Sequence, residues 1–209
     1  RVKNNLSISA GLMLIPMGIQ NLYHEPPTFN GVERTNVDKY IVPTTWREMG
    51  VSLRGRSNDN MISYELMIVN GFNGYDGEGV FNGSKGLRSG RQKGSESYMT
   101  HPDFASRISY IGIPNLNLGI SAYLGESESI AYNGIDMNDD HAVRSADSTV
   151  IGIQMIGVDA RFQDGPINIR GQYILAKLDN TDQYNIFTGK DLGNKMIGYY
   201  TEAGYNLLH

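Results

Sequence analysis

The feature that most constrains the fold is an alternation of apolar and polar residues that recurs in segments of about ten residues. In residues 6–14 the even positions are all apolar, whereas Ser7, Ser9 and Gly11 occupy odd positions. Because neighbouring side chains in a strand point to opposite faces, this period of two is typical of a strand with one apolar face. The same alternation recurs in residues 49–54, 62–68, 104–110, 117–124, 156–162, 167–175 and 197–207. The sequence therefore predicts about eight strands, each roughly long enough to cross a bilayer at a tilt.

The connections between these segments are alternately short and long. The short ones contain Asn, Asp, Gly or Pro, as tight turns require, and span residues 57–60, 114–115 and 163–166. The long ones cover roughly residues 15–44, 72–102, 127–147 and 179–195. Transmembrane barrels have short periplasmic turns and longer extracellular loops. We therefore predict an all-β, antiparallel, up-and-down transmembrane β-barrel, with a secreted or periplasmic antiparallel sandwich as the alternative.

Composition agrees with this class. The chain has 25 glycines, 13 tyrosines and no cysteine, so disulfides and thiolate chemistry are excluded. It has no apolar run of about 18 residues, which a transmembrane helix would need. A net charge of −4 without a basic run argues against nucleic acid as a partner. Trp46 and many tyrosines fall near strand ends, which makes them candidates for the aromatic girdles of a membrane protein.

Charged residues gather on the polar face of the predicted strands, where a wide wet lumen would solvate them. The candidate pore-lining residues are Glu48, Arg54, Arg56, Glu65, Arg107, Asp159, Arg161, Arg170 and Glu202. Arginine presents a fork of donors to anions, so a slight preference for anions is one hypothesis. The favoured interpretation is a ladder of arginine–carboxylate pairs that braces the wall. In a sandwich the same residues would lie on the exposed face.

Residues 10–56 resemble the porin-like outer-membrane proteins of the Bacteroidetes, which are distant relatives of the phosphate-selective porin O and P family. The resemblance rests on GLMLIPMGI at 11–19, YHEPPTFNGVER at 23–34, IVPTTWREMG at 41–50 and GVSLRG at 50–55. It implies a monomeric or trimeric barrel of about sixteen or more strands. The chain would then be one barrel segment over residues 1–209, cut at both ends, that supplies about half of the strands. A complete eight-stranded barrel, with a packed interior, is the second architecture.

The long connection at 15–44 is the candidate constriction loop, because an inward-folded loop narrows a pore and sets its selectivity by charge. Its charged candidates are His24, Glu25, Glu33, Arg34, Asp38 and Lys39. The alternative is a loop that packs over the barrel mouth and pairs its charges internally.

The sequence gives only weak evidence for a metal-binding or catalytic site. Asp136, Asp139 and Asp140 form an acidic cluster and are the weak candidate metal ligands, but the glycine and glutamate of a calcium loop are missing. His24 and Glu25 are not followed by the second histidine of a zinc-protease motif. We expect no catalytic residue, no metal and no cofactor, and hence not an enzyme.

The expected function is passive diffusion of small hydrophilic solutes, with anions as a hypothesis, through a porin in the outer membrane of a Gram-negative bacterium. The expected partners are outer-membrane lipid and lipopolysaccharide, the solutes, and further copies in a homotrimer or other outer-membrane proteins. The alternative is a non-conducting barrel that serves a surface complex as a structural or partner-binding component.

Overall fold

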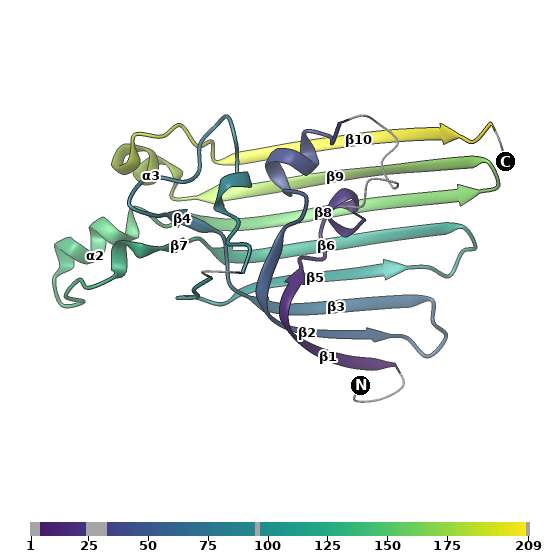
Figure 1. Ribbon diagram of the computed structural model, residues 1–209, viewed down its shortest axis with the longest axis horizontal. Helices are drawn as coiled ribbons and strands as arrows, with labels where there is room; N and C mark the ends of the chain where they lie inside the picture. The colour runs from purple at the N-terminus through teal and green to yellow at the C-terminus, as the bar shows by residue number, and fades with distance from the viewer. Residues whose placement is uncertain (1–4, 24–32, 95–96, 208–209) are drawn as a thin grey trace.

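The computed structural model describes residues 5–23, 33–94 and 97–207, and its main feature is one antiparallel sheet of eight strands. The strands are β1 (Leu6–Leu14), β2 (Arg47–Arg56), β3 (Ile62–Val69), β5 (Asp103–Tyr110), β6 (Leu116–Glu126), β8 (Gly152–Asp164), β9 (Ile167–Asp179) and β10 (Lys195–Tyr205). They neighbour one another in this order, each pair antiparallel (Figure 1). The prediction of an all-β, antiparallel fold with sequential strand pairing is confirmed.

Short and long connections lie at opposite edges of the sheet, as the spacing predicted. The turns at 57–61, 111–115 and 165–166 lie at one end of the strands, which is called the turn edge. The connections 15–46, 70–102, 127–151 and 180–194 lie at the opposite end of the strands, which is called the loop edge. Asn60 and Asn115 adopt positive φ in their turns, a conformation that asparagine tolerates better than most residues.

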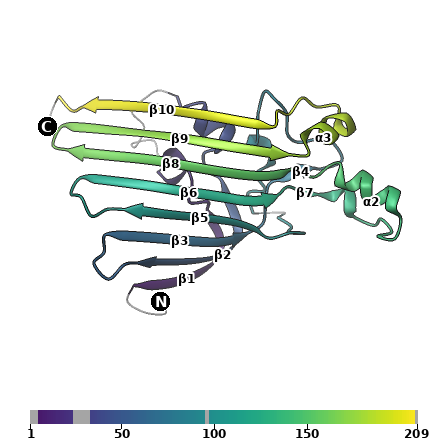
Figure 2. The ribbon, with the colours of Figure 1, turned by 180° about the vertical axis from the view of Figure 1, so that it is seen from behind.

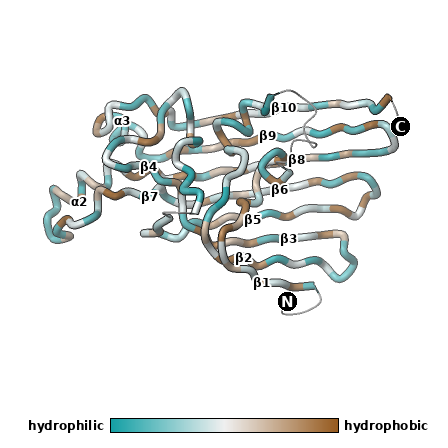
Figure 3. The backbone as a smooth tube through the Cα atoms, in the orientation of Figure 1, coloured by the Kyte–Doolittle hydropathy of each residue, from teal (hydrophilic) through white to brown (hydrophobic). Residues whose placement is uncertain are grey.

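The two faces of the sheet differ in kind. The face that the connections cover, nearest the viewer in Figure 1 and behind the strands in Figure 2, is called the inward face. The opposite, outward face exposes large apolar side chains from every strand, among them Ile8, Val51, Ile68, Ile108, Ile120, Ile156, Ile169 and Ile197. Figure 3 shows the resulting alternation of hydrophobic and hydrophilic residues along the strands.

Short helices and a small second sheet belong to the long connections. The helical elements are α1 (Ile19–Leu22), η2 (Val37–Ile41), η3 (Arg88–Gly90), η4 (Ile130–Tyr132), α2 (Asp140–Asp147) and α3 (Thr181–Thr188). The second sheet pairs β4 (Asn73–Tyr75) with β7 (Glu128–Ser129) in parallel. α2 and α3 extend beyond the loop edge, whereas the segment that carries α1 and η2 turns back over the inward face (Figures 1 and 2). In the described part of the chain, no helix is long and apolar enough to cross a membrane.

An aromatic cluster fills the inward face near the loop edge. Trp46 stacks on Phe72 with ring centroids 4.4 Å apart and contacts Tyr123 at 4.8 Å. Phe81 joins Phe72 to Tyr184 of α3, whose hydroxyl donates to the carbonyl of Gly74 at 2.7 Å. The long connections therefore share one dry core with the sheet instead of standing free in solvent.

Trp46 corrects one expectation. As a girdle residue it would face lipid at a strand end, but its side chain is 0% exposed and its indole N–H donates to Glu48 at 2.9 Å. Burial between the sheet and the long connections removes its large apolar surface from solvent, and the carboxylate satisfies its polar atom. Tyr64, Tyr110 and Tyr205 do lie on the outward face, near the turn edge.

The sheet is open. Among the described residues β1 pairs only with β2, and β10 pairs only with β9. A closed eight-stranded barrel would require β1 to pair with β10, so this chain alone does not form the second architecture.

Candidate functional site: the polar inward face

The described parts of the connection 15–46, residues 15–23 and 33–46, lie over the inward face, where a side chain of β9 contacts both parts. Gln172 accepts a hydrogen bond from the backbone N–H of Ile19 at 2.7 Å through its carbonyl oxygen. Its amide nitrogen donates to the Asp38 carboxylate at 2.9 Å. Both bonds are buried, and they hold α1 and η2 against the far half of the sheet from β1 and β2.

The local backbone of this connection requires glycine at one position. Gly18 has φ +79°, and a Cβ there would meet Val42 Cγ1 at 3.0 Å and Asp38 Oδ1 at 3.3 Å. Asn21 then ties the two ends of the connection together, because it donates to the Ile15 carbonyl and accepts from the Trp46 N–H. The described parts of the connection are thus ordered by buried hydrogen bonds of their own.

Between the folded connection and the turn edge, the inward face carries ion pairs. Arg54 pairs with Glu65 at 2.6 Å, and Arg170 pairs with Glu202 at 2.6 Å. These pairs, joined by the one described next, use six of the nine predicted pore-lining residues. This is the pairing that the bracing interpretation predicted.

The pair Arg107–Asp159 is the most constrained of them, because it crosses an intervening strand. The two guanidinium nitrogens donate to the two carboxylate oxygens at 2.7 and 2.8 Å, from β5 to β8 over β6. Gly119 of β6 lies directly beneath, and a Cβ there would sit 2.0 Å from Arg107 Nη2 and 2.7 Å from Asp159 Oδ2. A glycine in the middle of a strand is therefore what permits this bidentate contact.

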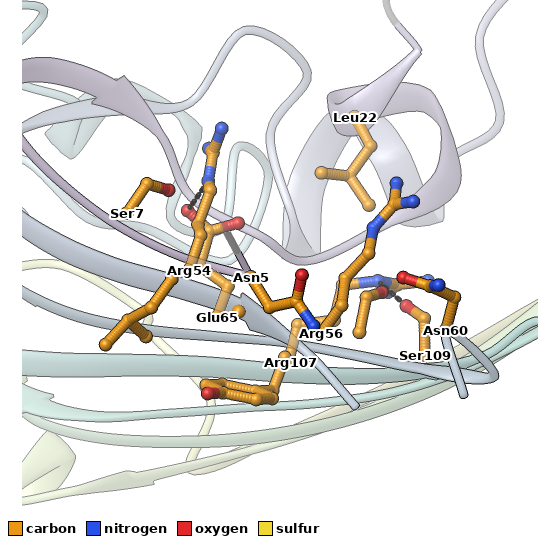
Figure 4. A pocket seen from close by; sticks show the side chains of 13 residues that line it. Asn5, Ser7, Leu22, Arg54, Arg56, Asn60, Glu65, Arg107 and Ser109 are labelled. Carbon is orange, nitrogen blue, oxygen red and sulfur yellow. Dashed lines mark hydrogen bonds and ion pairs between the residues drawn. The ribbon is translucent and has the colours of Figure 1, made fainter. Parts of the chain in front are cut away.

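Arg56 stands apart from the ion pairs. It is exposed and lines a cavity of about 680 Å³ near the turn edge, together with Arg54, Glu65, Arg107 and Asn60 (Figure 4). Among the described residues no carboxylate lies within ion-pair distance of Arg56. The cavity thus presents an uncompensated positive charge beside paired ones.

Arg161 and Glu48 complete the predicted set. The Arg161 guanidinium lies 3.8 Å from the ring centroid of Tyr23, at the end of the described part of the connection. Glu48 is 0% exposed, because the aromatic cluster covers it, and it accepts from Trp46 and from Asn70 at 2.9 Å. Glu48 therefore faces the dry core instead of the open cavity.

The predicted constriction residues separate into three groups. His24 and Glu25 lie outside the described residues. Asp38 is buried against Gln172 and Thr35, whereas Lys39 lies over the Tyr40 ring at 5.2 Å from its centroid. Glu33 is exposed and Arg34 is half-buried. The structure brings Asp38 to the sheet without bringing Lys39 there.

The weak metal candidates have local structural uses. Asp136 accepts from the N–H and side chain of Asn138, and Asp139 caps the start of α2 by accepting from His141 and Ala142. Asp140 begins α2. In the parts of the chain that the structure describes, no group of three or more His, Asp or Glu is placed to hold a metal.

Sequence reasoning missed Gln172, Gly119 and the aromatic cluster. Gly119 alternates with Leu118 and Ile120 like its polar neighbours Asn117 and Ser121, and only the register shows that it lies opposite Asp159. Asp139 carried a signal, because an aspartate before a helical segment is a common N-cap. Gln172 carried none, since its partners are more than a hundred residues away in sequence.

Comparison with known proteins gives one relative and no family. The chain is 31% identical, over 206 residues, to an uncharacterized protein of Aquifex aeolicus (strain VF5). The matched region covers 96% of this chain but 44% of that protein, so the chain spans less than half of its relative's length. No protein-family model matches the sequence, and no solved structure matches it.

Proposed function

We propose that this sheet is part of the wall of an outer-membrane β-barrel, and that the protein is a porin for small hydrophilic solutes. The observation that carries the proposal is the outward face. Its apolar side chains are exposed on all eight strands, with Ile120 60% exposed at the centre and Tyr199 77% exposed near one edge. Contiguous apolar surfaces of this extent on soluble monomers are rare, and lipid is the solvent that suits them.

The distribution of loops and charges argues against the sandwich alternative. In a sandwich the apolar face would be covered by a second sheet, and the polar face would meet water. Here the long connections cover the polar face, and no described element covers the apolar one. An inverted arrangement, with apolar side chains outward and ion pairs inward, is typical of a barrel with a wet lumen.

The open edges support a larger barrel than eight strands. β1 and β10 run in opposite directions and each has one free edge among the described residues. Unpaired strand edges are not tolerated in lipid, because their backbone groups would have no hydrogen-bond partners. Further antiparallel strands would close the barrel, in keeping with the expectation of about sixteen.

Within this barrel, the described parts of the connection 15–46, residues 15–23 and 33–46, narrow the lumen. They reach across the inward face and are fixed by Gln172, so part of the lumen is filled by protein. Solutes would pass beside the loop and along the polar zone that holds Arg56 and the ion pairs. Within each pair the two charges neutralise each other, whereas no carboxylate among the described residues pairs with Arg56 or Arg161, so we expect a modest preference for anions.

Single-channel conductance of the full-length protein in a planar lipid bilayer tests the proposal. We expect stable steps in the current, with a conductance typical of a water-filled barrel. Reversal potentials in asymmetric KCl then test the charge preference, and a preference for cations would remove the anion hypothesis. A protein that inserts but never conducts would overturn the channel.

One observation favours a second function, a non-conducting barrel that binds a partner. The aromatic cluster of Trp46, Phe72, Phe81, Tyr123 and Tyr184 occupies the inward face at the loop edge, and each of its side chains is 0% exposed. If comparable packing fills the rest of the lumen, conductance will be absent. Silent insertion would therefore select this function over the porin.

A further inference from the structure

Charged side chains on the outward face are confined to its two ends. Between them, every outward position of the eight strands is uncharged. The charged outward positions near the loop edge are Arg47, Glu126, Lys177, Asp179 and Lys195, and the one near the turn edge is Asp164. On the proposed function, the loop edge lies in the outer leaflet, since long loops of a barrel are extracellular.

Lys177 and Lys195 form an unusual pair within this rim. The register of β9 and β10 places them directly opposite one another, and both are exposed. Like charges at directly opposed positions destabilise a sheet unless something neutralises them. Among the described residues no carboxylate lies within ion-pair distance of either lysine, and the nearby Asp179 accepts instead from Gln154 at 3.2 Å.

The surface next to this pair suits hydrocarbon. One step toward the turn edge, Leu175 lies opposite Ile197, and Ile156 lies beside Leu175 on β8. One step further, Tyr173 lies opposite Tyr199. The two lysines thus lie at the end of an apolar strip, along which lysine stems can extend. On the proposed function, this end of the strip would be near the headgroups of the outer leaflet.

We propose that Lys177 and Lys195 bind the phosphate of an anionic lipid in the outer leaflet, with acyl chains along Ile156, Leu175 and Ile197. This inference rests on the proposed membrane location. The phosphate would neutralise the lysine pair, and the apolar strip would hold the chains. The ligand class is a phosphorylated lipid with several acyl chains, and lipid A is the probe.

Lipid retention tests this site. The full-length protein is folded into phosphatidylcholine vesicles that contain lipid A, extracted in mild detergent, and analysed by native mass spectrometry for bound lipid A. The wild type should retain lipid A, and dephosphorylated lipid A should be lost. The double variant K177Q/K195Q should bind lipid A more weakly, by roughly fivefold for each lysine near an anionic headgroup.

The matched control is K85Q/K190Q, which removes the same charge from two positions in the long connections and should retain lipid A like the wild type. Inorganic phosphate added during extraction should leave lipid A in place, because it offers no chains to the apolar strip. Equal retention by K177Q/K195Q and the wild type, or complete displacement by phosphate, would overturn the lipid site alone. A protein that enters no vesicle would overturn the membrane location as well, so the two failures are distinguishable.

Discussion

Individual side chains on the inward face work in pairs whose geometry is set by the strands between them. The Arg107–Asp159 contact spans β6 and depends on Gly119 having no side chain. Gln172 serves two partners in a connection far away in sequence. The role of each of these residues therefore depends on its contact partner and on the residue that lies between them.

Gly119→Ala should destabilise the protein. The added Cβ would displace the Arg107 guanidinium from Asp159, because it would occupy a point 2.0 Å from Nη2. The loss of a charge-assisted bidentate contact costs about 1.5–3 kcal/mol. Urea-unfolding midpoints of the protein in vesicles would measure it.

Gly204→Ala is the matched control for this change. Gly204 lies on the same face, in β10, and a Cβ there would meet no atom closer than 3.9 Å. Its midpoint should equal or exceed that of the wild type, since alanine costs less conformational entropy than glycine. Equal midpoints for the two alanine variants would contradict the crossing geometry.

Asp38→Asn should change how stability depends on pH. Burial raises the pKa of the Asp38 carboxyl above its ordinary value of 3.8, although hydrogen bonds from Thr35 and Gln172 oppose the shift. The folded state therefore holds this proton more tightly than the unfolded state. The contribution is fully present below the ordinary pKa and is lost as pH rises through the raised pKa. The variant should lose less stability than the wild type over this interval, as unfolding midpoints at several pH values would measure.

Asp136→Asn provides a control of opposite sign. Hydrogen bonds from Asn138 lower the pKa of the exposed Asp136 carboxyl, so its contribution is present above the ordinary pKa and is lost as pH falls. Asp136→Asn should therefore reduce the loss of stability at acid pH, and it should leave unchanged the loss that Asp38 causes as pH rises. Identical profiles for Asp38→Asn and the wild type would show that Asp38 is not shifted.

At the scale of elements, the segment 15–46 is the one whose position decides how much of the inward face is open. It begins and ends beside β1 and β2, yet α1 and η2 lie against β9 and β10, where Gly198 makes room for Val37 and Ile41. A Cβ at Gly198 would meet Val37 Cγ2 at 2.7 Å. The segment is therefore held by shape as well as by hydrogen bonds.

Gln172→Ala should release this segment and enlarge the channel. The buried Ile19 N–H would lose its acceptor at a cost of about 1–3 kcal/mol, and Asp38 would lose one of its donors while keeping Thr35. Single-channel recordings should show larger or more variable steps than those of the wild type. Gln154→Ala, on the outward face of the neighbouring strand, should leave the steps unchanged. Identical conductance for Gln172→Ala and the wild type would mean that the segment does not narrow the path.

The strands could be predicted from the sequence, whereas the position of this segment could not. Alternation over 6–14 or 197–205 is local information, and it sets both the strand and the face of each side chain. The contact between Ile19 and Gln172 joins residues 153 positions apart, and no periodic pattern in the sequence predicts it. Trp46 was misplaced for the same reason, because a strand end adjoins both the lipid interface and the inner core, and only long-range packing decides between them. The ion pairs could be predicted in part. Alternation places the charges on one face, but the pairing of Arg107 with Asp159 depends on the position of Gly119 between them.

At the scale of the whole molecule, the outward face governs where the protein can reside. It is apolar across its width, and its charges stand at its ends. A water-exposed surface of this kind would favour aggregation, whereas a bilayer would stabilise it.

Ile120→Arg separates these environments. At the centre of the outward face an arginine should destabilise a membrane-inserted protein by about 2–4 kcal/mol, as at the midplane of other transmembrane barrels. In water the same change would be neutral or would improve solubility. Folding efficiency in vesicles, followed by the gel-mobility difference between folded and unfolded protein, would measure it.

Ile186→Arg is the control, because Ile186 lies in α3 beyond the loop edge and is 85% exposed. It should fold into vesicles as well as the wild type. Equal folding of the two arginine variants would argue that the outward face does not meet hydrocarbon.

The sequential pairing of the sheet also has an arithmetic consequence. β1 starts at the turn edge and β10 finishes there, so the eight strands make whole hairpins with none left over. Hairpins can be added to or removed from such a unit without sending any long loop to the opposite side of the membrane. Because barrel diameter grows with strand number, each added hairpin widens the ring by one fixed increment. On the proposed function, adding whole hairpins to this unit would widen the bore and leave the orientation of every existing loop unchanged.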